Sequence, residues 1–275
     1  MKSYLKLVNF EMSRFFKLYL ILIGLTIVSQ LIGSVVVSKG YMNNANEVIY
    51  ENQLPMSQYI DQYGEFSFNR FVFSGWFGMP IVFCVAMLMI YVFFIWYRDW
   101  FGKNTFIYRL LMLPTERLNI YFAKLTTIML FVLGLIALQI LLILIELQIV
   151  YSIIPVELRT DLAFFEVYKF DILSLLYPNT FIEFVLIYGI GLIFVAVLFT
   201  GILIERSYRL KGIFLAIVYG MLSFGFFIAP LVLDSFYTNY FYPNEIFVMV
   251  LVTSIIVLGS AIWLANHLLK HKIRV

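Results

Sequence analysis

The chain has 275 residues, of which 63% are hydrophobic and 13% are charged, and its net charge is +3. An ordinary soluble domain carries about 25% charged residues, and a soluble fold of this length cannot bury so much apolar surface. The composition therefore excludes a soluble globular enzyme and a disordered chain, and it argues against a nucleic-acid binder. It predicts an all-α polytopic membrane protein. The single cysteine, Cys84, excludes an internal disulfide and any multi-cysteine metal site.

The first segment, 1–17, has the periodicity of a basic amphipathic helix that lies at the inner membrane interface. Its apolar face is formed by Tyr4, Leu5, Val8, Met12, Phe15 and Phe16. Leu7 and Phe10 break the pattern, because they fall on the polar side. Exposed apolar residues can mark a partner surface, so both are candidate contacts for a cytoplasmic partner. The alternative is a membrane-surface helix that tolerates two exceptions.

Six apolar stretches follow, each long enough to cross a bilayer core about 30 Å thick as a helix. They are Leu18–Val37, Phe71–Tyr97, Tyr121–Ile149, Phe181–Ile204, Gly212–Leu233 and Glu245–Asn266. The domain organisation is therefore an interface helix over 1–17 and a six-helix transmembrane domain over 18–275. Loop 38–70 is rich in Asn, Gln and Glu, and we expect it to be irregular.

Positive charge predicts the orientation of these spans. Segments 1–17, 98–124, 205–211 and 267–275 hold 15 of the 19 Lys and Arg residues. The alternate segments hold only four, and they carry most of the acidic residues. Both termini are therefore expected on the cytoplasmic side.

Ionisable side chains inside a membrane mark ion or proton pathways, because placing them there is expensive. The predicted spans contain four: Lys124, Glu146, Glu183 and Glu245. Each lies within four residues of a span end, where a side chain can reach water. This pattern disfavours an ion-coupled carrier.

The longest inner loop, Arg98–Lys124, is predicted to be a rigid elbow. A break at Gly102 and Asn104 precedes a short helical run over 106–113, whose apolar residues include Phe106, Leu110, Leu111 and Leu113. Pro114 ends this run and is well suited to begin the next helix. Glu116 and Arg117 follow, where they pair with partner charges or are solvated. The alternative is that this loop is only the start of the third membrane-spanning helix and has no role in binding a partner.

No catalytic or metal-binding motif is present in the sequence. It contains no H-E-x-x-H, no G-x-S-x-G and no P-loop, so ATP hydrolysis would need another subunit. We expect no catalytic residue, no metal ligand and no cofactor in this chain.

The residues from Leu113 to Lys124 resemble the L-P-x-x-R-x-x-I-x-x-A-K pattern of ABC-2 type permeases, the membrane subunits of ATP-binding-cassette transporters. Leu113, Pro114, Arg117, Ile120, Ala123 and Lys124 match it. As in that family, the pattern joins the second span to the third. The segment Asp234–Asn244 is too short for the re-entrant helices of many polysaccharide exporters. The chain is therefore more similar to the bacterial peptide, bacitracin and modulin exporters.

The resemblance implies a complex of two membrane chains, identical or related, with two P-loop ATPase subunits that carry ATP and Mg²⁺. The loop after span two would supply a coupling helix that binds the ATPase. The expected function is export of a hydrophobic or amphipathic compound, such as a peptide, across a bacterial cytoplasmic membrane. The rival hypothesis is a non-transporting membrane sensor or assembly factor that docks a cytoplasmic partner through the same elbow. A lipid-modifying or proteolytic enzyme has little support.

Overall fold

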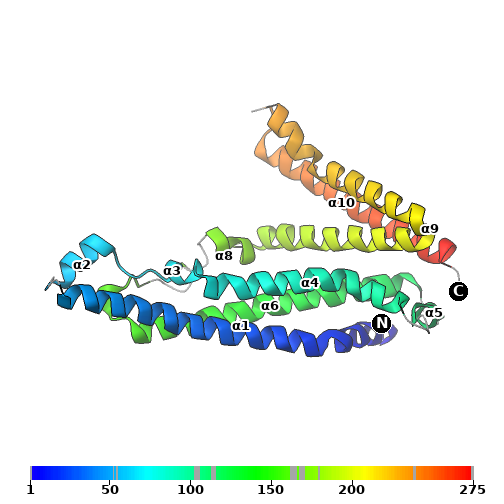
Figure 1. The fold of residues 1–275 in the computed structure, drawn as a ribbon. Helices are drawn as coiled ribbons and strands as arrows, with labels where there is room; N and C mark the ends of the chain where they lie inside the picture. Colours follow the sequence, from blue (N-terminus) through cyan, green and yellow to red (C-terminus); the bar gives the residue numbers. More distant parts are fainter. Residues whose placement is uncertain are drawn as a thin grey trace. The chain divides into compact units, whose positions relative to one another are not determined.

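The computed structural model describes residues 2–51, 53, 55–101, 106–112, 116–161, 166, 171–178, 180–237 and 240–273. Over these residues the chain is helical apart from short connections, with one isolated bridge between Phe66 and Arg159 and no strand (Figure 1). The α-helices are α1 Lys2–Glu51, α2 Met56–Tyr63, α3 Phe68–Val72, α4 Gly75–Trp100, α5 Phe106–Leu111, α6 Leu118–Ile153, α8 Asp171–Leu176, α9 Phe181–Phe236 and α10 Pro243–His267. Two short turns, η1 Val156–Leu158 and η2 Leu268–Lys272, complete the described elements.

Five helices of the described part are long and apolar enough to cross a membrane: α1, α4, α6, α9 and α10 with η2. Their most apolar windows reach mean hydropathies of 2.4 to 3.1. This confirms the predicted class, an all-helical, multi-pass membrane protein, at the level of helix type and length.

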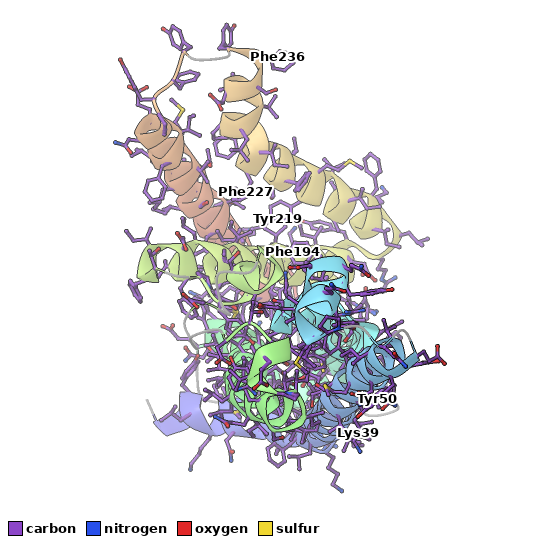
Figure 2. All side chains as sticks on the ribbon, turned by 90° about the vertical axis from the view of Figure 1, so that its left-hand side faces the viewer. Lys39, Tyr50, Phe194, Tyr219, Phe227 and Phe236 are labelled. Carbon is purple, nitrogen blue, oxygen red and sulfur yellow. The ribbon has the colours of Figure 1, made fainter. Side chains whose placement is uncertain are left out.

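Helix α9 contains both stretches that the sequence assigned to spans four and five. Its 56 residues are interrupted at Arg209, whose φ of 54° and ψ of −130° are not helical. A Cβ atom at Gly212 would lie 2.6 Å from the carbonyl oxygen of Glu205, and one at Gly201 would lie 3.9 Å from the Cβ of Ala216. The two halves of α9 therefore fold back on each other as a hairpin, which the change of direction in Figure 1 also shows. In Figure 2, Phe194 marks the first half, and Phe227 marks the second.

Helix α1 is longer than the sequence predicted. It runs from Lys2 to Glu51 as one element, so residues 1–17 do not form a separate helix and loop 38–70 is not irregular throughout. No proline or glycine interrupts the first 23 residues, and nothing there ends a helix. At the other end, buried Tyr41 and Ala45 are four residues apart and hold the polar extension of α1 against the aromatic side chains of 59–77.

The chain divides into two compact units. The first comprises 1–14, 89–130 and 185–275, and the second comprises 15–88 and 131–184. The core of the first unit is aromatic: the Phe199 ring centroid lies 5.6 Å from that of Trp96 and 5.8 Å from that of Tyr121. The Tyr121 hydroxyl donates to the Ala196 carbonyl at 2.9 Å, and the Thr200 hydroxyl donates to the Ala261 carbonyl at 3.1 Å. These bonds join α6, α9 and α10.

The second unit packs α1 in parallel against α6. The Tyr19 hydroxyl donates to the Phe131 carbonyl of α6, and further along α1 the Tyr41 hydroxyl donates to the carbonyl of Leu158, in the η1 turn that follows α6. Inside this unit Glu146 has no exposed surface, and neither of its carboxylate oxygens has a hydrogen-bond partner among the described residues. The prediction that the Glu146 side chain reaches water at a span end is therefore wrong, because this side chain is buried within the chain. Glu183 and Glu245, by contrast, are exposed.

Candidate functional site

Lys124, the last residue of the L-P-x-x-R-x-x-I-x-x-A-K pattern, is the centre of a buried ion cluster in the first unit. Its side chain has no exposed surface. The ammonium group donates to the Glu11 carboxylate at 2.7 Å, to the Asp99 carboxylate at 2.5 Å and to the Ile95 carbonyl at 2.8 Å. An ammonium group has three hydrogens, so all of them are used. The Trp96 ring lies 5.2 Å from the nitrogen and covers it.

Two arginines complete the cluster. Arg14 donates to the Asp99 carboxylate at 2.7 Å, and Arg98 donates to the Glu11 carboxylate at 3.2 Å. Three positive and two negative groups thus meet where residues 11–14 of α1, the end of α4 and the second turn of α6 come together. The two carboxylates are each bound by more than one of the three basic side chains. The cluster is stabilising only while every member is present, because a buried charge that loses its partner is costly. The cluster therefore fixes these three segments to one another.

Helix α5 packs on the N-terminal part of α1 next to the ion cluster. The rings of Phe10 and Phe106 stack with their centroids 5.6 Å apart. The guanidinium of Arg14 lies 5.1 Å from the Phe10 centroid and 5.3 Å from the Phe106 centroid. Arg14 thus belongs to the ion cluster and also contacts α5, so the position of α5 depends on the same residue that pairs with Asp99.

The face of α5 that contacts the rest of the chain is the one that the sequence assigned to a partner. Leu110 and Leu111 are buried within the chain, as is Ile107, and Phe106 is half-buried in the stack with Phe10. The opposite face is open: Tyr108 is 38% exposed, Arg109 is also exposed, and Met112, directly after the last residue of α5, is 70% exposed. The exposed surface of this segment therefore consists of Tyr108, Arg109 and Met112.

The other predicted contacts are distributed differently. Leu7 is buried inside the chain, whereas Phe10 is 37% exposed. Leu113 and Pro114 lie outside the described residues. Glu116 is exposed.

Arg117 is not a free surface charge, because it binds the C-terminal turn. Its guanidinium donates to the carbonyls of Leu269 and Ile273, at 2.6 and 3.0 Å. These carbonyls belong to the end of the last helix, where orphan acceptors need donors. Both basic residues of the resembling pattern thus serve contacts within the chain: Lys124 with α1 and α4, and Arg117 with η2.

The turn of the α9 hairpin joins the same region. The Tyr97 hydroxyl donates to the Glu205 carboxylate, and the Arg206 guanidinium lies 4.7 Å from the Tyr97 ring centroid and 5.1 Å from that of Phe101. Contacts of the first unit therefore bring together all four segments in which the sequence concentrates its basic residues.

Sequence reasoning did not find the ion cluster. The sequence does contain one signal for this cluster. Glu11 is an isolated acidic residue, since the next acidic residue in the chain is Glu47. It lies four residues from both Leu7 and Phe15, on the face that is buried. No metal-binding group of three or more His, Cys, Asp or Glu side chains occurs among the described residues.

The chain was compared with family models, curated proteins and solved structures, and none of them matches it.

Proposed function

We propose that this chain is the membrane-spanning permease subunit of an ATP-driven ABC exporter of the ABC-2 type. It would cross a bacterial cytoplasmic membrane six times, with α9 supplying two spans, and it would act with a second permease chain and two P-loop ATPase subunits. Hydrophobic or amphipathic compounds, peptides among them, would be its cargo. The chain itself performs no chemistry, and ATP is hydrolysed with Mg²⁺ in the partner subunits.

The observation that carries this proposal is the junction of the four basic segments in the first unit. A permease driven by a separate ATPase needs an element that binds the ATPase and a rigid connection from that element to the spans. Helix α5 has an open face and is held by Phe10 and Arg14. Arg14 shares Asp99 with Lys124, which is the seventh residue of α6. A displacement of α5 therefore acts on α1, α4 and α6 together.

The open face of α5 is the first place to test the proposal. Tyr108→Ala with Met112→Ala removes exposed apolar groups and leaves the buried contacts of α5 in place. Truncated interface anchors cost about 1–4 kcal/mol, so we expect at least a tenfold weaker association with the ATPase that co-purifies with the wild-type chain. Stimulation of its ATP hydrolysis in nanodiscs should fall in parallel. Glu116→Ala should have a smaller, salt-sensitive effect, as expected for a rim charge.

The matched control is Tyr50→Ala with Met79→Ala, two residues of the second unit that are at least as exposed as Tyr108 and Met112. It removes the same side chains and should leave ATPase association unchanged. Wild-type association and stimulation in the α5 variant would contradict a coupling role for this face. An ATPase that binds through α5 while no cargo leaves ATP-loaded vesicles would fit the sensor or assembly factor instead.

The proposal also predicts a membrane orientation. In a Cys84→Ser background, a cysteine at Gln58 should react with an impermeant maleimide in intact cells, because α2 belongs to the acidic side. A cysteine at Lys17 should react only after permeabilisation. Both native side chains are exposed, so access within the chain does not limit either reaction. The reverse pattern of labelling would place the ion cluster outside the cell and exclude coupling to a cytoplasmic ATPase.

A further inference from the structure

The second unit contains a hollow of about 320 Å³ between α1, α2 and α3. This volume lies at the lower end of the range for small-molecule sites, about 300–1,000 Å³. Three of its lining residues are tyrosines, and two carry opposite charges. The hollow is lined by Tyr41, Asn44, Glu47, Val48, Tyr59, Tyr63 and Arg70.

The aromatic wall of the hollow is held in place by the fold. Tyr41 and Tyr59 are buried, and their ring centroids are 6.3 Å apart in an edge-to-face arrangement. The Tyr59 ring stacks on Tyr63 at 5.0 Å. The single hydrogen of the Tyr41 hydroxyl is shared between the carbonyl oxygens of Gly64 and Leu158, 3.1 and 3.4 Å from the hydroxyl oxygen, and this fixes the ring. The tyrosine faces are therefore positioned before any ligand binds.

The two charged residues at the hollow have no ion-pair partner among the described residues. Arg70 lies with its guanidinium carbon 5.5 Å from the Tyr41 ring centroid, and Glu47 is exposed on α1. A guanidinium binds phosphate through two parallel hydrogen bonds, and a tyrosine face attracts an ammonium group. The hollow thus has Arg70 for an anion, and Glu47 with the exposed Tyr63 ring for a cation, which is complementary to a small zwitterion.

The distance of these groups along the chain from the apolar helices matches the order of charges in a zwitterionic lipid. Arg70 lies in α3, five residues before Gly75, the first residue of the apolar helix α4, so we expect it near the edge of the hydrocarbon layer. Glu47 lies ten residues beyond Val37, the last residue of the first apolar run, and is further from the membrane centre. In a phospholipid the phosphate is also nearer the acyl chains than the ammonium group is.

We propose that this hollow binds the headgroup of a zwitterionic phospholipid, with the phosphate on Arg70 and the ammonium group against Glu47 and the Tyr63 ring. The proposal requires a membrane protein but does not rest on the coupling to an ATPase. It can therefore be tested on the purified chain alone, and each proposal can fail without the other.

Native mass spectrometry of the detergent-solubilised full chain provides the test. Phosphatidylethanolamine and phosphatidylglycerol with identical acyl chains share the phosphate, and only the first carries an ammonium group. We expect the wild-type chain to retain phosphatidylethanolamine preferentially. Glu47→Gln should abolish this preference, and Arg70→Gln should weaken retention of both lipids about tenfold or more, whereas Arg70→Lys should keep part of it. Soluble glycerophosphoethanolamine should compete with phosphatidylethanolamine in the wild type.

Glu51→Gln and Lys39→Gln are the matched controls, since both remove an exposed charge of α1 that does not line the hollow; Figure 2 labels Lys39. Both should bind lipid as the wild type does. Equal retention of the two lipids by the wild type would overturn the proposal. So would competition by the dipeptide alanyl-alanine without competition by glycerophosphoethanolamine, because the hollow would then bind a peptide terminus.

Discussion

Lys124→Met is expected to give the largest loss of stability among single substitutions in the first unit. The methionine fills similar space but donates no hydrogen bond, so the carboxylates of Glu11 and Asp99 each lose a partner in a buried position. Breaking a buried ion pair by removing one member costs about 3–5 kcal/mol. Thermal unfolding in nanodiscs should show a clearly lower midpoint, and ATPase stimulation should be lost with it.

A double-mutant cycle separates the ion cluster from ordinary loss of charge. Glu11→Gln should destabilise the wild type more than it destabilises the Lys124→Met variant, because its main partner is already absent in the latter. Lys17→Met removes an exposed lysine of α1 and should leave the unfolding midpoint nearly unchanged. Additive effects of Glu11→Gln and Lys124→Met would show that the two side chains are not coupled.

Gly212→Val is expected to open the α9 hairpin. A Cβ atom at position 212 would lie 2.6 Å from the Glu205 carbonyl oxygen and 2.7 Å from the Glu205 Cα, which are backbone atoms that cannot rotate away. Overpacking costs about 1–3 kcal/mol and more where backbone must move. Because Glu205 also accepts the Tyr97 hydroxyl, the turn would be displaced from α4. Disulfide cross-linking between cysteines at Gly201 and Ala216 should fall sharply in this variant.

Gly220→Val is the matched control for the hairpin. Gly220 lies in the second half of α9, and a Cβ atom there would meet nothing within 4 Å. Valine is also a better helix former than glycine, so this variant should fold and cross-link as the wild type does. Normal cross-linking in Gly212→Val would contradict the close approach of the two halves.

The helical class and the long apolar helices could be predicted because hydrophobic run length depends only on local sequence. The position of the turn in α9 could also be predicted, since the basic residues at 206–211 separate two apolar stretches. The continuation of α1 beyond Val37 was not, because its polar residues resemble a loop. Tyr41 and Ala45 make this segment helical through contacts with residues far along the chain, and such contacts leave no local pattern.

The orientation of α5 shows a second limit of sequence reasoning. Its apolar residues were predicted to face a partner, but the side chains of Ile107, Leu110 and Leu111 are buried against other residues of the same chain. Periodicity identifies the apolar face of a helix without saying which surface covers it. The ion cluster was missed for a related reason. Its members come from three separate segments, with the α1 residues more than 80 positions from their partners in α4 and α6, and each one alone resembles a solvated charge near a span end.

The charged and polar residues of α6 have a consequence for biosynthesis. This helix carries Lys124, Gln139 and Glu146, all buried, yet its most apolar window has the highest mean hydropathy of the five long helices, 3.1. An ionised side chain at the centre of a span opposes insertion from the translocon by about 2.5–3.5 kcal/mol, while each leucine or isoleucine favours it by about 0.3–0.6 kcal/mol. With ten leucines and eight isoleucines, α6 offsets its own polar residues. It can therefore enter lipid before Glu11 or Asp99 has reached Lys124, and the ion cluster can assemble afterwards from helices that are already inserted.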